Sequence, residues 1–165
     1  MNIPVYYVTY GDLSVLSLVE KPAIETDFQI FSEQKVVKFS LDEEKHIAFG
    51  PAMIADKPIY RIAKDGQPYY LVFTADIIEK MVLDAEKENN LSFSLEHSGQ
   101  QLPADKVYMI ESFISRPGLV PEEFSDIALG SWYVSLKIED NQIWQDLKDG
   151  KYNGFSIECM VDLKE

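Results

Sequence analysis

The sequence predicts an α+β fold, built mostly as an antiparallel β-barrel or curled sheet with two or three helices. Three observations lead to this expectation. The chain has 165 residues, enough for one domain with a substantial core, which we place at residues 1–165. Hydrophobic residues make up 46% of it and include nine Tyr, nine Phe and two Trp, as in a packed β-rich protein. Short segments of alternating polarity also outnumber the helical stripes.

The first half of the chain predicts strands separated by turns. The apolar run Val15–Val19 is expected to form a strand that ends at Glu20-Lys21-Pro22, because proline cannot continue a ladder of hydrogen bonds. The segment Thr26–Glu44 is polar and weakly patterned, so we expect a loop or an irregular crossover there. Two further strands are predicted at His46–Ile54 and Ile59–Ala63, on either side of a turn at residues 56–58.

The clearest helix of the sequence follows a hairpin. Lys64–Gln67 predicts a turn into a strand at Tyr69–Phe73. Thr74 is a candidate N-cap, and the helix is expected to end near Glu88–Asn90. Between these points, apolar residues recur with helical spacing at Ile77, Ile78, Met81, Val82 and Ala85. We expect this stripe to pack flat against the sheet.

The second half predicts more strands and one short helix. Alternating polarity indicates strands at Leu91–His97, Val107–Ile114 and Trp132–Ile138. A helix capped near Asp140 or Asn141 is expected to end at Gly150. The last predicted strand is Gly154–Leu163.

Composition excludes several classes of function. The formal charge of −13 disfavours nucleic-acid binding, since the average surface repels phosphate and no basic patch is evident. No apolar run approaches the length of about 18 residues that a membrane helix needs. The single cysteine, Cys159, cannot form an internal disulfide, and the first residues lack the pattern of a secretory signal. We therefore expect a soluble protein of the cytoplasm.

Two histidines limit any chemistry that needs an imidazole. His46 follows a run of charged residues, Asp42–Lys45, where an exposed residue without function is expected. His97 lies at the end of a predicted strand, directly before Ser98-Gly99 breaks it. On this evidence alone, a hydrogen-bonded histidine of the core is the more common case for His97.

Ser156 has the setting that a nucleophilic serine requires. Alternation along the last predicted strand places Phe155, Ile157, Cys159 and Val161 on one face, so Ser156 and Glu158 point to the other. A packed strand holds the backbone still while the hydroxyl faces outward, and a hydroxyl reacts only when a positioned base takes its proton. Most serines on strands nevertheless have no such role, and position 158 departs from the G-x-S-x-G motif.

Several short segments, in this order, resemble one protein family. They are Ser17–Ala23, Phe49–Ile54, Ile59–Arg61, Tyr69–Phe73, Leu95–His97, Ile110–Ile114, Gly130–Trp132 with Val134 and Lys137, Trp144, Lys148–Gly150 and Gly154–Glu158. Together they make the chain similar to phage prohead serine proteases, of the type found in PBSX-like prophages, which are distant relatives of the herpesvirus assemblin proteases. The resemblance covers nearly the whole chain.

The resemblance implies a function and assigns residues to it. It implies a herpesvirus-protease-like fold and a serine endopeptidase that needs no cofactor and no metal. Its substrates would be the scaffolding protein and the prosegment of the major capsid protein, cut inside the assembling prohead in the host cytoplasm, together with the enzyme itself. By position, Ser156 would be the nucleophile and His97 the general base. Whether the chain forms a homo-oligomer stays open.

The third catalytic residue has three candidates. The herpesvirus relatives use a second histidine after the serine, but no histidine follows Ser156. Glu111 is the first choice, because we expect its strand to be the neighbour of the His97 strand; Glu96 and Glu158 come next. The donors that would stabilise the oxyanion stay open among Arg61, Arg116 and backbone amides.

Two other classes of function remain as alternatives. The same fold could serve as a catalytically inactive scaffold-binding or virion structural protein, which composition and charge fit equally well. A metallohydrolase is disfavoured, because Glu96-His97 lacks the H-E-x-x-H spacing and the chain has only two histidines.

Overall fold

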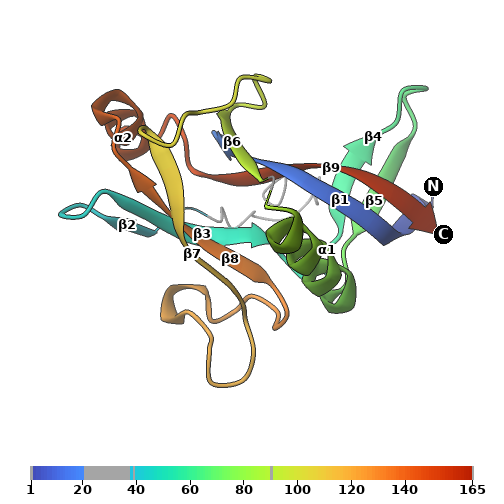
Figure 1. The fold of residues 1–165 in the computed structure, drawn as a ribbon. Helices are drawn as coiled ribbons and strands as arrows, with labels where there is room; N and C mark the ends of the chain where they lie inside the picture. The colour runs from blue at the N-terminus through green and yellow to red at the C-terminus, as the bar shows by residue number, and fades with distance from the viewer. Residues whose placement is uncertain (1, 21–37, 39, 90, 165) are drawn as a thin grey trace.

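The computed structural model describes residues 2–20, 38, 40–89 and 91–164, which form two curled sheets and two α-helices (Figure 1). The first sheet has five strands: β4 (Ile59–Ile62), β5 (Pro68–Val72), β1 (Val5–Val19), β6 (Ser92–Leu95) and β9 (Gly154–Lys164). The second has four: β2 (Ser40–Asp42), β3 (Ile47–Met53), β8 (Trp132–Ile138) and β7 (Val107–Ile114). In the described residues the helices are α1 (Ala75–Glu88) and α2 (Asn141–Lys148), and Glu122–Phe124 form a 3₁₀ turn, η2. The predicted α+β class, the curled sheet and the two helices are confirmed.

Strand β1 organises the first sheet because other strands pair along both of its edges. β5 and β6 pair with its two ends in parallel, and β9 pairs antiparallel along nearly its whole length. Tyr7 is opposite both Val72 and Lys164, so β5 and β9 must lie on opposite edges. The same geometry at the other end places β1 between β6 and β9, the two strands that carry or precede the candidate residues.

Most predicted elements are present, but one expected relation between strands is wrong. The two strands on either side of residues 56–58 are present and belong to different sheets, β3 to the second and β4 to the first. Asp56, with a positive φ of 60°, redirects the chain, and its N–H donates to Phe73 O at 2.8 Å. The choice of Glu111 required β6 to pair with β7, but β6 pairs with β1. β1 also begins ten residues before the apolar run that predicted it.

Two predictions fall wholly or partly outside the described residues. The turn at Glu20-Lys21-Pro22 includes residues 21 and 22, and the segment Thr26–Glu44 includes residues 26–37 and 39, all outside the described part of the chain. The last residues of that segment contribute β2 and a turn that leads into β3.

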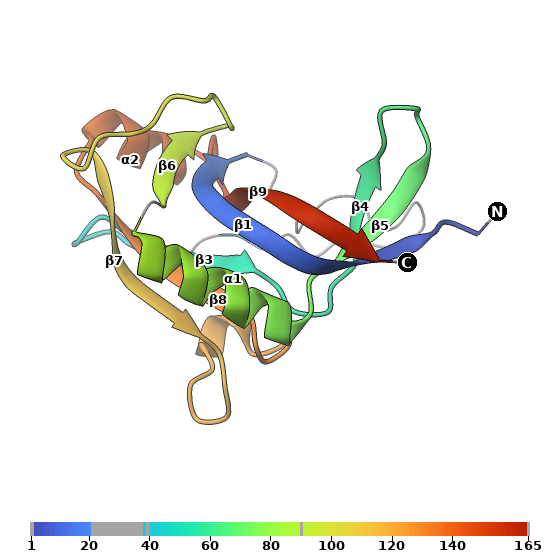
Figure 2. The ribbon, with the colours of Figure 1, turned by 45° about the vertical axis from the view of Figure 1, so that its right-hand side comes forward.

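Helix α1 packs against β1 through the predicted stripe (Figure 2). Its buried residues are Ile78, Met81, Val82 and Ala85. The close approach requires glycine at position 11 of β1, where a Cβ would lie 2.6 Å from Met81 Cε. Thr74 is the N-cap residue, as predicted, although its side chain makes no capping hydrogen bond. Among the described residues, no helix is long and apolar enough to cross a membrane.

Aromatic side chains of the second sheet pack against one another, and one of them carries a polar group without a hydrogen-bond partner in the described structure. Tyr133 stacks on Phe113 with ring centroids 5.4 Å apart and is fully buried, yet its hydroxyl has no hydrogen-bond partner among the described residues. Burial raises the pKa of Tyr133 to about 12. On folding, the hydroxyl loses its hydrogen bonds to water and gains no partner among the described residues, which destabilises the fold.

Tyr133→Phe is therefore expected to raise the free energy of unfolding by about 1 kcal/mol, measured by urea denaturation. Tyr108→Phe is the matched control, because the Tyr108 hydroxyl donates to Glu139 Oε1 at 3.0 Å on the surface. That variant should gain nothing. Destabilisation by Tyr133→Phe would mean that the hydroxyl has a stabilising partner.

Candidate active site

Ser156 lies near the start of β9, where apolar residues of β9 and β1 pack around it. It is 7% exposed, and in the β1–β9 ladder it is directly opposite Ser17. The flanking residue Phe155 is almost completely buried, as is Leu18 opposite it. This packing holds the serine backbone in one position, as the alternation of the sequence predicted.

His97 occupies a tight turn directly after β6. Both central residues of this turn have positive φ, 49° for Glu96 and 53° for His97, and Ser98 N–H donates to Leu95 O at 2.9 Å. This is the pattern of a type I′ turn, in which residues other than glycine, asparagine and aspartate are strained by about 1 kcal/mol each. Strained backbone of this kind often occurs at functional sites, where the surrounding structure holds it.

Two hydrogen bonds fasten this turn to the end of β1. Glu96 N–H donates to Leu18 O at 2.9 Å, and the Glu96 carboxylate accepts from Glu20 N–H at 2.6 Å. β6 and β9 flank β1, so their backbones lie roughly 10 Å apart. The fastened turn lets the His97 side chain span that gap.

The imidazole of His97 contacts two polar residues on one face of β9, the buried Ser156 and the partly exposed Glu158. Its Nε2 lies 3.0 Å from Ser156 Oγ, and its Nδ1 lies 3.2 Å from Glu158 Oε1. Because Ser156 and Glu158 are two residues apart on one strand, both side chains emerge from the same face. The side chains of His97 and Glu158 are 35% and 40% exposed, whereas Ser156 is buried. The imidazole therefore lies at the molecular surface, above the buried serine.

The contacts favour one tautomer of His97. A carboxylate beside Nδ1 favours a proton on that nitrogen, which leaves the lone pair of Nε2 directed at the Ser156 hydroxyl. The hydroxyl can then donate to Nε2. A serine, an imidazole base and a carboxylate that orients the base are the groups needed for acyl transfer.

Glu111 does not take part in this arrangement, and the expectation that placed it there is corrected. It lies on β7 in the second sheet, is exposed, and its Oε2 accepts from Ser135 Oγ at 3.1 Å. The choice rested on β7 pairing with the strand of His97, but β6 pairs with β1. Glu96 lies beside His97 in sequence, yet its carboxylate is bound to Glu20 N–H. Of the three candidates, Glu158 is the one that contacts the imidazole.

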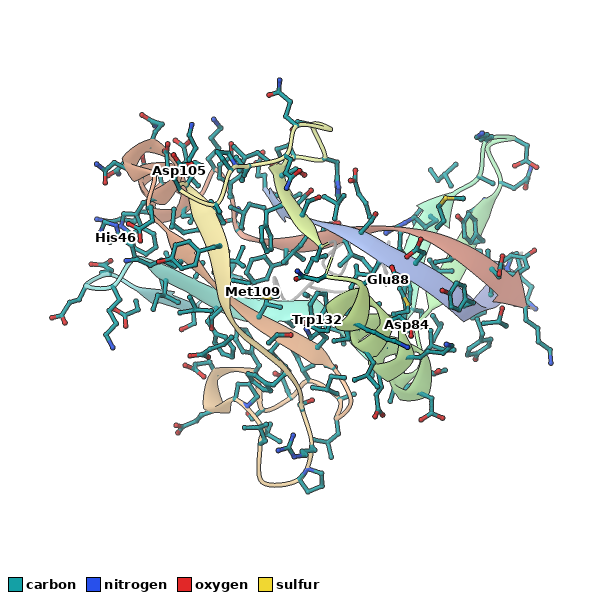
Figure 3. All side chains as sticks on the ribbon, in the orientation of Figure 1. His46, Asp84, Glu88, Asp105, Met109 and Trp132 are labelled. Atoms are coloured by element: carbon teal, nitrogen blue, oxygen red, sulfur yellow. The ribbon has the colours of Figure 1, made fainter. Side chains whose placement is uncertain are left out.

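The other residues considered from sequence lie in different surroundings. His46 stacks on Trp144 of α2 with ring centroids 4.5 Å apart, at the end of the molecule where α2 lies (Figure 3). Arg116 lies in a turn closed by Leu119 N–H donating to Arg116 O at 2.8 Å, in the connection from β7 to β8. Arg61 lines a cavity that Ser156 also borders.

Two buried serines beside Ser156 were not identified from the sequence. Ser17 Oγ and Ser94 Oγ lie 2.5 Å apart, and both side chains are almost fully buried. The register aligns Ser94, Ser17 and Ser156 in a row across β6, β1 and β9. One signal was available, since Ser17 is a polar position between the apolar Leu16 and Leu18 of β1.

The thiol of Cys159 is not suited to nucleophilic attack. Burial raises its pKa to about 11, despite the nearby positive charge of Arg61. A thiol with this pKa is protonated at neutral pH, and the thiolate is the reactive species. No group of His, Cys, Asp or Glu side chains in the described part of the chain could hold a metal ion.

Cys159 should therefore react slowly with iodoacetamide at pH 7.5, much more slowly than a free cysteine with the ordinary pKa of about 8.5. The measurement is the rate of mass increase of the intact folded chain over a range of pH. We expect the rate to rise steeply as the pH approaches 11. Rapid labelling at neutral pH would contradict the buried setting of the thiol.

Comparison with known proteins agrees with the chemistry of this site. A family model with the description "Putative phage serine protease XkdF" matches residues 35–165, which include His97, Ser156 and Glu158. No curated protein and no solved structure matches the chain. The match covers most of the chain, and the protein therefore belongs to this family of phage serine proteases.

Proposed function

We propose that the protein is a serine endopeptidase in which Ser156 is the nucleophile, His97 the general base and Glu158 the residue that orients the base. The observation that carries this proposal is the continuous contact from Ser156 Oγ through the His97 ring to Glu158 Oε1, at 3.0 and 3.2 Å. Family membership supports a serine protease, and these side chains supply its machinery.

Acylation follows from the positions of the side chains. Ser156 Oγ attacks the carbonyl carbon of the peptide bond, while His97 Nε2 accepts the hydroxyl proton. The resulting imidazolium is held by Glu158 at Nδ1. The tetrahedral intermediate then collapses, the C–N bond breaks, and Nε2 returns its proton to the leaving amine. The acyl group stays on Ser156 as an ester.

Deacylation repeats these steps with water in place of the serine. His97 Nε2 accepts a proton from a water molecule, whose oxygen attacks the ester carbonyl. Collapse of the second intermediate releases the acid product and returns the proton to Ser156 Oγ. Two easier steps replace one difficult hydrolysis.

The proposed substrates are the scaffolding protein and the prosegment of the major capsid protein of the same phage. They would be cut inside the assembling prohead in the host cytoplasm, and the protease would also cut itself. The phage origin of the family supports an assembly role, because a head that encloses its protease limits cleavage to proteins packaged with it.

Co-expression of the full chain with the phage's scaffolding and major capsid proteins tests these substrates. Intact-mass measurement should find defined cleavage products with the wild-type protein and none with Ser156→Ala. Uncleaved scaffold and capsid proteins with both forms would refute the head-maturation role, and identical products with both forms would refute the catalytic assignment.

A further inference from the structure

A cavity beside the nucleophile has the size and lining of a side-chain pocket. Its volume is about 190 Å³, larger than an apolar cavity of about 150 Å³ that accommodates benzene. Strands β3, β4, β5 and β9 and the residues after β3 and β5 form its wall, and Ser156 is part of it. The lining from β9 consists otherwise of Phe155, Ile157, Cys159 and Val161, the face opposite to Glu158.

Among the described residues, the wall of this cavity holds one charged side chain, Arg61. The residues around it are almost all apolar, among them Ile59, Leu71 and Phe73. Burial lowers the pKa of Arg61, although an arginine remains protonated at any physiological pH. The cavity therefore combines apolar walls with one positive charge.

Arg61 has spare hydrogen-bonding capacity in the described structure. Its Nη1 donates to the carbonyl of its own neighbour, Tyr60, at 2.9 Å. No carboxylate of the described residues lies within ion-pair distance of its guanidinium. A guanidinium has five N–H donors in a fork that matches a carboxylate, and a partly desolvated cation without a counter-ion is costly. A bound anion would remove that cost.

The position of Arg61 relative to Ser156 suits a substrate side chain. The charge of Arg61 acts on Cys159, three residues beyond Ser156 on β9, which is roughly 10 Å along an extended strand. Within the described residues, β9 pairs along one edge only, with β1. A peptide extended along the other edge would direct alternate side chains to the two faces of the sheet, one of them toward the cavity.

We propose that this cavity is the specificity pocket of the protease and takes an acidic side chain, a glutamate or an aspartate adjacent to the cleaved bond, whose carboxylate Arg61 binds. The inference rests on the proposed function of Ser156. The net charge of −13 disfavours the approach of acidic peptides, so the selection comes from the pocket and not from long-range attraction.

The test maps the ends of the products formed on co-expression with the scaffolding and major capsid proteins. Wild-type cleavage sites should contain glutamate or aspartate beside the cut bond. At a site with glutamate, changing that residue to Gln, which keeps the shape and removes the charge, should lower cleavage there by on the order of 100-fold, and Lys should block it.

Variants of the protease then separate specificity from catalysis. Arg61→Gln should remove the preference for Glu over Gln, Arg61→Lys should retain it in part, and Arg61→Glu should shift cleavage to the site that carries Lys. Arg116→Gln, in an exposed turn, is the matched control and should cut like the wild type. Thermal melting checks that each variant folds.

These outcomes separate failure of the specificity pocket from failure of the proposed function. Wild-type cleavage without acidic residues beside the cut bonds overturns the pocket but leaves the Ser156 protease in place. Equal loss at the Glu and Gln sites in Arg61→Gln also overturns it, since Arg61 would then serve every substrate alike. Absence of cleavage by the wild type overturns the pocket together with the head-maturation role.

Discussion

Ser156→Ala and His97→Ala should each lower the rate of peptide-bond cleavage by on the order of a millionfold, to a level close to background. In the proposed mechanism Ser156 Oγ forms the acyl bond, and alanine has no hydroxyl to replace it. His97 Nε2, 3.0 Å from that oxygen, is the proposed base that makes the hydroxyl reactive. The measurement is the rate of product formation by mass spectrometry under co-expression with the scaffold and capsid proteins.

The double variant should be no slower than either single variant, because the two residues act as one unit. His46→Ala and Ser98→Ala are the matched controls. His46 stacks on Trp144, and Ser98 Oγ accepts from Gln100 N–H, so neither residue contacts Ser156 in the described structure. Both controls should retain cleavage. A wild-type rate in Ser156→Ala or in His97→Ala would contradict the assignment.

Glu158→Gln should lower the turnover rate by on the order of 100- to 10,000-fold and leave KM nearly unchanged. An amide next to Nδ1 can donate as well as accept, so it no longer selects the tautomer in which Nε2 receives the serine proton. It also loses the charge that stabilises the imidazolium. The partial exposure of Glu158 places the expected loss below that of a fully buried carboxylate.

Glu111→Gln is the control that separates the sequence-based choice from the observed contact. Glu111 is exposed on β7 and bonded to Ser135, so its variant should keep wild-type turnover. Steady-state kinetics of the two variants, compared after thermal melting confirms that both fold, provides the readout. A defect in Glu111→Gln together with a normal Glu158→Gln would restore the original expectation.

Local patterns were sufficient to predict the elements, because helical and strand periodicities depend on neighbouring residues. The stripe Ile78, Met81, Val82 and Ala85 located α1, and alternation located β7, β8 and β9 within a residue or two. Strand pairing depends on residues far apart in the chain, such as Ser17 and Ser156, and no local pattern encodes it. The pairing of β6 with β1 was therefore missed.

The error about the third residue follows from that missing pairing. Alternation had already placed Glu158 on the same face as Ser156, and in the structure both side chains contact the His97 ring from that face. The preference for Glu111 came from the assumption that strands consecutive in sequence are neighbours in space. The strained turn at Glu96 and His97 was equally hidden, because residues with positive φ there are neither glycine nor asparagine.

The most direct test of the central claim is to locate the adduct of a fluorophosphonate probe, which reacts with activated serine hydroxyls. The probe is applied during co-expression with the scaffold and capsid proteins, and peptide mass spectrometry identifies the modified residue. We expect one adduct on this protein, at Ser156, that is absent from His97→Ala and much reduced in Glu158→Gln. Labelling of Ser17 or Ser94 instead, or equal labelling of Ser156 in His97→Ala, would contradict it.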